Sequence, residues 1–172
     1  MIISIDPGLN HVAVALWSDR GTLLHASLVR NPDTRNKKLP RPERWAIMAS
    51  AVVRKISSMP TVAYDPHQSL GLVVEIPKVR QRGSGKGDPN DLIDVAGVAA
   101  AIVAAFKATA GAFVAWAPLP EEWKGQLPKE VSLARVQEKL TSAEKATVED
   151  PPPGLYHNVI DAIHLGIVHF KR

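Results

Sequence analysis

The sequence of 172 residues contains no cysteine. Disulfide bonds and catalysis by a thiolate are therefore excluded, and a zinc ion would have to be bound by histidine and carboxylate side chains alone. This absence leaves open the metals that prefer oxygen ligands, such as Mg²⁺.

Long apolar runs and a basic leader are also lacking. We find no apolar segment that approaches the roughly 20 residues of a membrane span. The first residues, Met1 to Asp6, lack the basic region that opens a signal peptide. We therefore expect a cytoplasmic protein that makes no contact with a membrane.

The residues that are present form an ordinary globular composition with an excess of positive charge. The chain is 45% hydrophobic and 22% charged, which is typical of a folded chain and not of a disordered one. Its length favours a single domain over residues 1–172. The net charge of +4, the pI near 9.5 and the clustering of lysine and arginine favour a polyanionic partner such as nucleic acid.

The hydrophobic pattern predicts five strands and four helices. The strands are expected at 2–6, 11–17, 22–29, 70–75 and 112–116. The helices are expected at about 42–58, 91–109 with Asp91 as the cap, 129–140 and 156–170. Right-handed crossovers would place the last two strands parallel to the first. We therefore predict an α/β, RNase H-like fold with a five-stranded mixed sheet, three antiparallel strands and then two parallel ones, and helices on both faces.

Three acidic residues stand in otherwise apolar surroundings. Asp6 ends the first strand, Glu75 ends the fourth, and Asp161 lies within the last helix. Burying each of them ionised would cost several kcal/mol without a partner. The first and fourth strands are predicted to be parallel neighbours, so Asp6 and Glu75 should meet at the carboxyl edge of the sheet, where such sheets bind ligands. Converging carboxylates without matching cations predict a Mg²⁺ or Mn²⁺ site.

Each acid also has a simpler interpretation. Asp6 could serve the turn that begins with Pro7, Glu75 could pair with Lys78 or Arg80, and Asp161 could face solvent. We favour the metal site because one shared cause explains all three positions.

Four segments, taken together, resemble the RuvC family of Holliday-junction resolvases. Three contain the acids, at 3–8, 73–75 and 157–162, and the fourth, at 120–131, contains Lys124 and Lys129. The segments follow the family's order along nearly the whole chain. The resemblance implies a hydrolase that uses two Mg²⁺ ions, replaceable by Mn²⁺, to cut four-way junctions and other branched DNA. The small size would suit a phage-type member, acting in a bacterial or phage-infected cell.

The resemblance implies that Asp6, Glu75 and Asp161 are catalytic metal ligands. The family usually has an acid or histidine three residues before the last aspartate, where this chain has Asn158, preceded by His157. Both positions share a helix face with Asp161, so either could complete the site. We favour His157 slightly, although it could simply lie near the start of the helix.

Two further departures concern contacts with DNA. The segment after Glu75 lacks the aromatic residue that the family places at the junction centre, and Val79, Arg80 and Gln81 stand there instead. An Arg-Gly pair of the family is replaced by Ala96 and Gly97. One phosphate contact is therefore missing, or is supplied by Arg80 or Arg82.

Several basic residues are candidates for phosphate contacts, because they follow Glu75 or lie in the fourth motif. These predicted DNA-binding residues are Lys78, Arg80, Arg82, Lys86, Lys124 and Lys129. A second basic cluster, between Arg30 and Arg44, suits a DNA arm or a solvated surface equally well.

The segment 95–106 is apolar on every side of its predicted helix. A helix that covers only the sheet needs a polar outer face, so a second apolar cover is expected. The resemblance implies a homodimer through this helix, whose two-fold axis would match a four-way junction. The alternative is a helix buried within one subunit.

Two other functions compete with a junction resolvase. A ribonuclease H acting on RNA–DNA hybrids would use the same metal chemistry, but the predicted dimer helix and basic segment count against it. A catalytically silent protein that binds branched DNA is the other alternative, and the retention of three acids argues against it.

Overall fold

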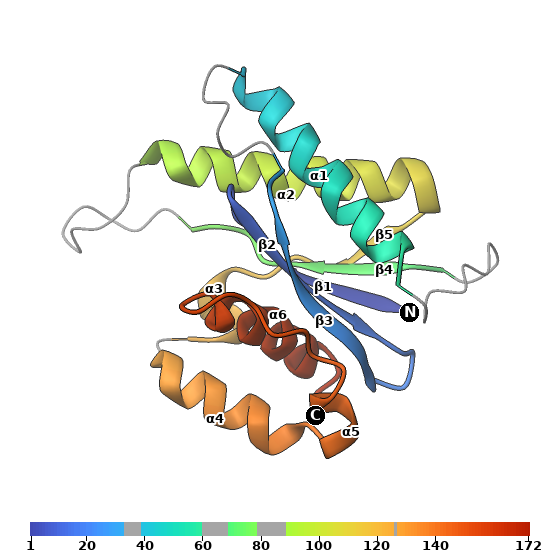
Figure 1. The fold of residues 1–172 in the computed structure, drawn as a ribbon, viewed down its shortest axis with the longest axis vertical. Coiled ribbons are helices and arrows are strands. Elements are labelled where there is room, and N and C mark those ends of the chain that lie inside the picture. Colours follow the sequence, from blue (N-terminus) through green and yellow to red (C-terminus); the bar gives the residue numbers. More distant parts are fainter. Residues whose placement is uncertain (33–38, 60–68, 79–88, 126) are drawn as a thin grey trace.

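A computed structural model describes residues 1–32, 39–59, 69–78, 89–125 and 127–172. Within these ranges five strands form one sheet in the order β3-β2-β1-β4-β5 (Figure 1). They are β1 (Ile2–Asp6), β2 (His11–Trp17), β3 (Leu23–Arg30), β4 (Gly71–Val74) and β5 (Phe113–Trp116). The β1–β2 and β2–β3 pairs are antiparallel, whereas β4 lies parallel to both β1 and β5. The predicted mixed sheet is confirmed.

Helices cover both faces of this sheet. They are α1 (Arg41–Ser57), α2 (Pro89–Ala110), α3 (Pro120–Trp123), α4 (Lys129–Lys139), α5 (Ser142–Lys145) and α6 (Tyr156–His169). Figure 1 shows α1 and α2 on one face and α3 to α6 on the other. The α2 helix begins at Pro89, so Asp91 lies in its first turn and is not the cap that we predicted. The four-residue helices α3 and α5 were not predicted, because they are too short to show a helical period.

Side chains of the central strands alternate between the two faces. Ile3 and Ile5 of β1 belong to the core beneath α1 and α2. Ser4, between them, faces α6: its hydroxyl donates to the carbonyl oxygen of Ala162 at 2.7 Å and accepts from Nε1 of Trp17 at 2.8 Å. Since side chains alternate along a strand, Asp6 points to the α6 face as Ser4 does.

Close packing brings α6 onto this face. A Cβ at Gly166 would lie 2.3 Å from the ring of Trp17, so a larger residue could not be accommodated without displacing the helix. Val159, Ala162 and Ile163 of the same helix are fully buried against the sheet. The position of α6, and of Asp161 within it, is therefore set by packing against β1 and β2.

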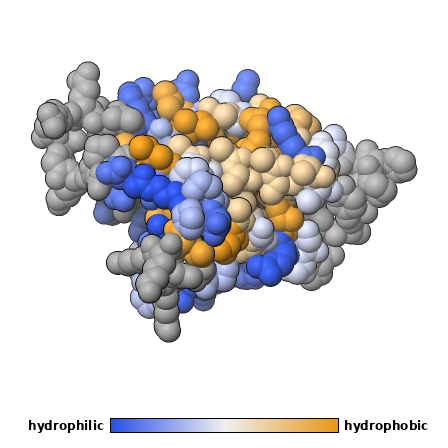
Figure 2. Space-filling model, turned by 90° about the horizontal axis from the view of Figure 1, so that it is seen from above, coloured by the Kyte–Doolittle hydropathy of each residue, from blue (hydrophilic) through white to orange (hydrophobic). Residues whose placement is uncertain are grey.

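The outer face of α2 is apolar and exposed. Ile93 is 53% exposed, and Ala96, Ala100 and Ala104 are exposed along the same stretch. Figure 2 shows the α1 and α2 side of the molecule, where apolar side chains form a broad area. By length and composition, Asn90–Ala110 could cross a membrane, although the same test is passed by core helices of soluble proteins. Our expectation that no apolar segment approaches the length of a membrane span was wrong, because the alanines that follow Asp94 keep the rest of this helix apolar.

Candidate active site

Glu75 emerges beside Asp6 on the same face of the sheet. It follows β4 directly, and its backbone N–H donates to the carbonyl oxygen of Ile5 at 3.1 Å, which continues the parallel pairing of β4 with β1. Val73 packs with Trp123 and Leu165 on the α6 face. Glu75 lies two residues further along and therefore points to that face as well.

Asp161 enters the site from α6. Its Oδ2 forms an ion pair with Nζ of Lys124, the residue that follows α3. Both side chains are mostly buried. The sheet edge thus supplies two carboxylates, and the helix that packs on it supplies the third.

The three carboxylates influence one another electrostatically. Burial raises the pKa of Asp6 well above its ordinary value, and the charges of Glu75 and Asp161 raise it further against the opposing effect of Lys124. Burial also raises the pKa of Glu75, where Lys124 and a hydrogen bond from Trp123 act in the opposite direction and Asp161 in the same one. Within the described part of the chain, Lys124 is the cation that lowers the pKa of both Asp6 and Glu75, and a site with three acids favours an additional cation.

The chemistry of these donors fits a hard divalent cation. Carboxylate oxygens are the ligands that Mg²⁺ and Mn²⁺ prefer, and the excess negative charge requires compensation. Among the described residues, no three His, Asp or Glu side chains are placed so that they would hold a metal ion together. In this arrangement the cation in contact with Asp161 is Lys124.

Trp123 contacts both Glu75 and the buried His164 of α6. Its Nε1 donates to Oε2 of Glu75 at 3.0 Å. The indole meets the ring of His164 edge-on, with centroids 5.3 Å apart, and Nδ1 of His164 lies 2.8 Å from Oγ of Ser132. Sequence reasoning missed these three residues. The spacing of His164, three residues after Asp161 on α6, was the available signal.

The two candidates for a fourth ligand lie in the first turn of α6. His157 and Asn158 are both partly buried. His157 lines a hollow of about 140 Å³ between α4 and α6, together with Asp161. This shared hollow places His157 on the side of α6 that carries Asp161, and the identity of the fourth ligand stays a prediction.

The predicted DNA-binding residues fall into three groups. Lys78 is exposed and pairs with Glu121 of α3, and Lys124 pairs with Asp161. Lys129 is the first residue of α4. Arg80, Arg82 and Lys86 lie outside the described residues.

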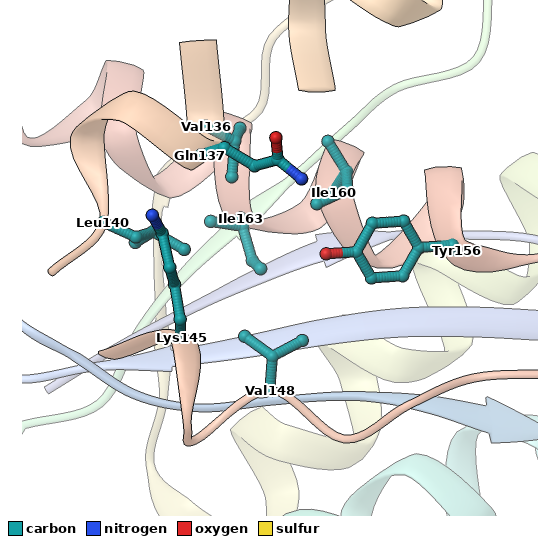
Figure 3. Close-up of a pocket in the computed structure, with 8 residues that line it drawn as sticks. All are labelled: Val136, Gln137, Leu140, Lys145, Val148, Tyr156, Ile160 and Ile163. Carbon is teal, nitrogen blue, oxygen red and sulfur yellow. The ribbon is translucent and has the colours of Figure 1, made fainter. Parts of the chain in front are cut away.

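A separate pocket of about 200 Å³ opens between α4, α6 and the segment that follows α5 (Figure 3). Val136, Ile160 and Ile163 make its walls apolar, and Tyr156 and Lys145 bring polar atoms to it. None of the three acids lines this pocket. The carboxylates are therefore gathered at the sheet edge and not in this hollow.

Comparison with known proteins identifies the fold. Neither a scan against protein-family models nor a search of curated proteins gives a match. The solved structures that match include T. thermophilus RuvC in complex with a Holliday junction substrate. The two chains are 20% identical, the match covers 98% of this chain and 91% of that one, and the TM-score is 0.62. Over nearly its whole length, the chain therefore has the RNase H-like fold of RuvC.

Proposed function

We propose that this protein is a metal-dependent endodeoxyribonuclease that resolves Holliday junctions and other branched DNA. One observation carries the proposal. Asp6, Glu75 and Asp161 interact electrostatically at one edge of the sheet. The fold that brings them together matches, over 98% of the chain, that of RuvC in complex with a Holliday junction substrate. The fold alone would allow many activities, and the three acids favour metal chemistry on a phosphate ester among them.

The side chains have distinct roles in this proposal. Asp6, Glu75 and Asp161 would hold two Mg²⁺ ions, or Mn²⁺ in their place, with His157 or Asn158 completing the set. When bound, the ions would supply Lewis acidity at the scissile phosphate and an activated water for in-line attack. Lys124, which pairs with Asp161, would attract the phosphate to the site. Lys78 and Lys129, with Arg80, Arg82 and Lys86, would bind the DNA backbone.

We further propose a homodimer formed through residues 95–106. The exposed alanines of α2 support it, because small side chains allow two helices to approach closely. A two-fold dimer would present two sites to opposing strands of a four-way junction.

A cleavage assay tests the proposal directly. Purified protein is incubated with a labelled four-way junction, a duplex of the same sequence, and an RNA–DNA hybrid, each with and without Mg²⁺. We expect cleavage of the junction only with Mg²⁺, at a rate well above that of the duplex. Preferred cleavage of the hybrid would support a ribonuclease H instead. Junction binding without any cleavage would support a silent binding protein.

A further inference from the structure

The carboxylate of Glu75 is held by a residue outside the set of proposed metal ligands. Nε1 of Trp123 donates to Oε2 of Glu75 at 3.0 Å, and Trp123 is only 7% exposed. An indole N–H can donate but not accept, so this bond favours the ionised carboxylate. Trp123 thus offsets part of the cost of placing an ionised acid at this site.

The indole is fixed from several sides. It packs against Val73 of β4 and Leu165 of α6. The ring of His164 meets it at 82°, the edge-to-face arrangement that aromatic pairs favour. His164 is itself anchored to Ser132 of α4, and both residues are buried. The support for Trp123 therefore comes from β4, α4 and α6 together.

Three buried polar side chains, Ser132, His164 and Trp123, form a continuous series of contacts that ends at Glu75. Apolar residues would fill the space between α4 and α6 without the cost of burying a hydroxyl, an imidazole and an indole N–H. Instead, the contacts run from Ser132 to His164, then to Trp123, and end on an oxygen of Glu75. The same helix, α6, carries Asp161 into the site and His164 into this support.

We infer that Trp123, backed by His164 and Ser132, is a positioning residue that fixes the orientation of the Glu75 carboxylate for binding of a divalent cation. This inference rests on the proposed function. With Oε2 engaged by the indole, the carboxylate offers its other oxygen to the cation in one orientation. Groups that orient metal ligands in this way typically change metal affinity or activity about 10- to 100-fold when they are removed.

Two variants with matched chemistry test the inference. Trp123→Phe keeps an aromatic ring against His164 but removes the N–H donor. Trp45→Phe removes another indole-to-carboxylate hydrogen bond of 3.0 Å, to Asp94, on the opposite face of the sheet. Mn²⁺ binding is measured by calorimetry without DNA, junction cleavage is measured as kcat and KM, and thermal unfolding is followed for each protein.

We expect Trp123→Phe to weaken Mn²⁺ binding by about tenfold or more. Its kcat should fall by a similar factor while KM for the junction stays near the wild-type value. Trp45→Phe should show a similar change in thermal unfolding without a change in Mn²⁺ affinity or kcat. Ser132→Ala, which leaves the indole in place, should give a smaller loss of both Mn²⁺ affinity and kcat. This variant provides the test if Trp123→Phe does not fold.

The outcomes separate this inference from the proposed function. Wild-type Mn²⁺ affinity in folded Trp123→Phe, or an equal loss in Trp45→Phe, would overturn the positioning role. A wild-type protein that binds Mn²⁺ but cuts no branched DNA would overturn the proposed function alone, and the Mn²⁺ affinities would still decide the role of Trp123. A wild-type protein that binds no Mn²⁺ would overturn both.

Discussion

At the scale of single residues, Asp6 shows the conflict that a buried carboxylate creates within a fold. Burial and two neighbouring acids raise its pKa, so the folded protein binds a proton there more tightly than the unfolded chain does. Stability therefore falls as the pH rises from the ordinary value of 3.8 through the raised one. Without a metal ion, this acid therefore destabilises the fold at pH values above 3.8.

This conflict leads to a prediction for the three acids. Asp6→Asn, Glu75→Gln and Asp161→Asn should each abolish junction cleavage and leave junction binding intact or tighter, because less negative charge faces the phosphates. In metal-free buffer at neutral pH, thermal unfolding should show equal or higher stability for Asp6→Asn. Full cleavage by any of the three variants would remove that residue from the site, and a large loss of folding would instead assign it a structural role.

Glu144 is a buried acid whose charge has the opposite effect on stability. It is 3% exposed, and it accepts hydrogen bonds from the Leu23 N–H at 2.9 Å and from Nη1 of Arg172 at 2.7 Å. Burial alone would raise its pKa, but the bonds from Arg172, Leu23 and Thr141 lower it from 4.5 to about 2. Stabilisation by this charge is therefore present above pH 4.5 and is lost as the pH falls towards 2.

The lowered pKa of Glu144 predicts how the Glu144→Gln substitution should change stability at different pH values. At about 1.4 kcal/mol per pKa unit, the charge contributes on the order of 3 kcal/mol at neutral pH. The difference in unfolding free energy between wild type and variant should have this size at pH 7 and shrink steadily below pH 4.5. Denaturant unfolding across that range measures it, with the exposed Glu138→Gln as the control. A difference that does not depend on pH would contradict the assignment.

How much of the site could be predicted depends on the range of the interactions involved. Asp6 and Glu75 follow from strand alternation and parallel pairing, which are local patterns that a sequence displays. Trp123 and His164 meet only because α3 packs against α6, and no local pattern encodes that contact. The ion pairs of Lys124 with Asp161 and of Lys78 with Glu121 depend on tertiary packing in the same way.

At the scale of elements, the predicted strands and long helices were confirmed, with ends that shift by one or two residues. The strand expected at 70–75 ends at Val74, so Glu75 stands just beyond it. The short helix α3 was missed, although it carries Trp123 and is followed by Lys124. Helices of one turn are set by their caps and neighbours more than by a repeating apolar pattern.

The short helix α3 also leads to a prediction about DNA binding. Glu121 of α3 pairs with Lys78, which follows β4, and both side chains are largely exposed. Glu121→Gln should free Lys78 for phosphate, tighten junction binding and steepen its salt dependence by up to about 0.9 in the log–log slope. Fluorescence anisotropy over a range of salt concentrations measures this, with Glu138→Gln as the control. Lys78→Ala should act in the opposite direction, and unchanged slopes in both variants would exclude Lys78 from the interface.

At the scale of the whole molecule, the two faces of the sheet are covered differently. On one face α6 is largely buried, with α4 packed beside it. On the other, α1 and α2 pack together, and Gly97 allows Trp45 to lie against α2, where a Cβ would come within 2.4 Å of the ring. This leaves the alanines of α2 as an apolar outer surface with no cover inside the described part of the chain.

Our last prediction is that a second copy of the chain covers this surface. Ala100→Arg combined with Ala104→Glu would place opposite charges on exposed positions of α2, where they cost little within one subunit but would have to be buried in a dimer. Light scattering at micromolar concentration should show a dimer for the wild type and a folded monomer for the variant. Ala134→Arg with Gln137→Glu makes the same charge changes on exposed positions of α4 and should remain dimeric. A monomeric wild type, or a variant that stays dimeric, would show that α2 is not the interface, and paired cuts across a junction would then require a different arrangement of subunits.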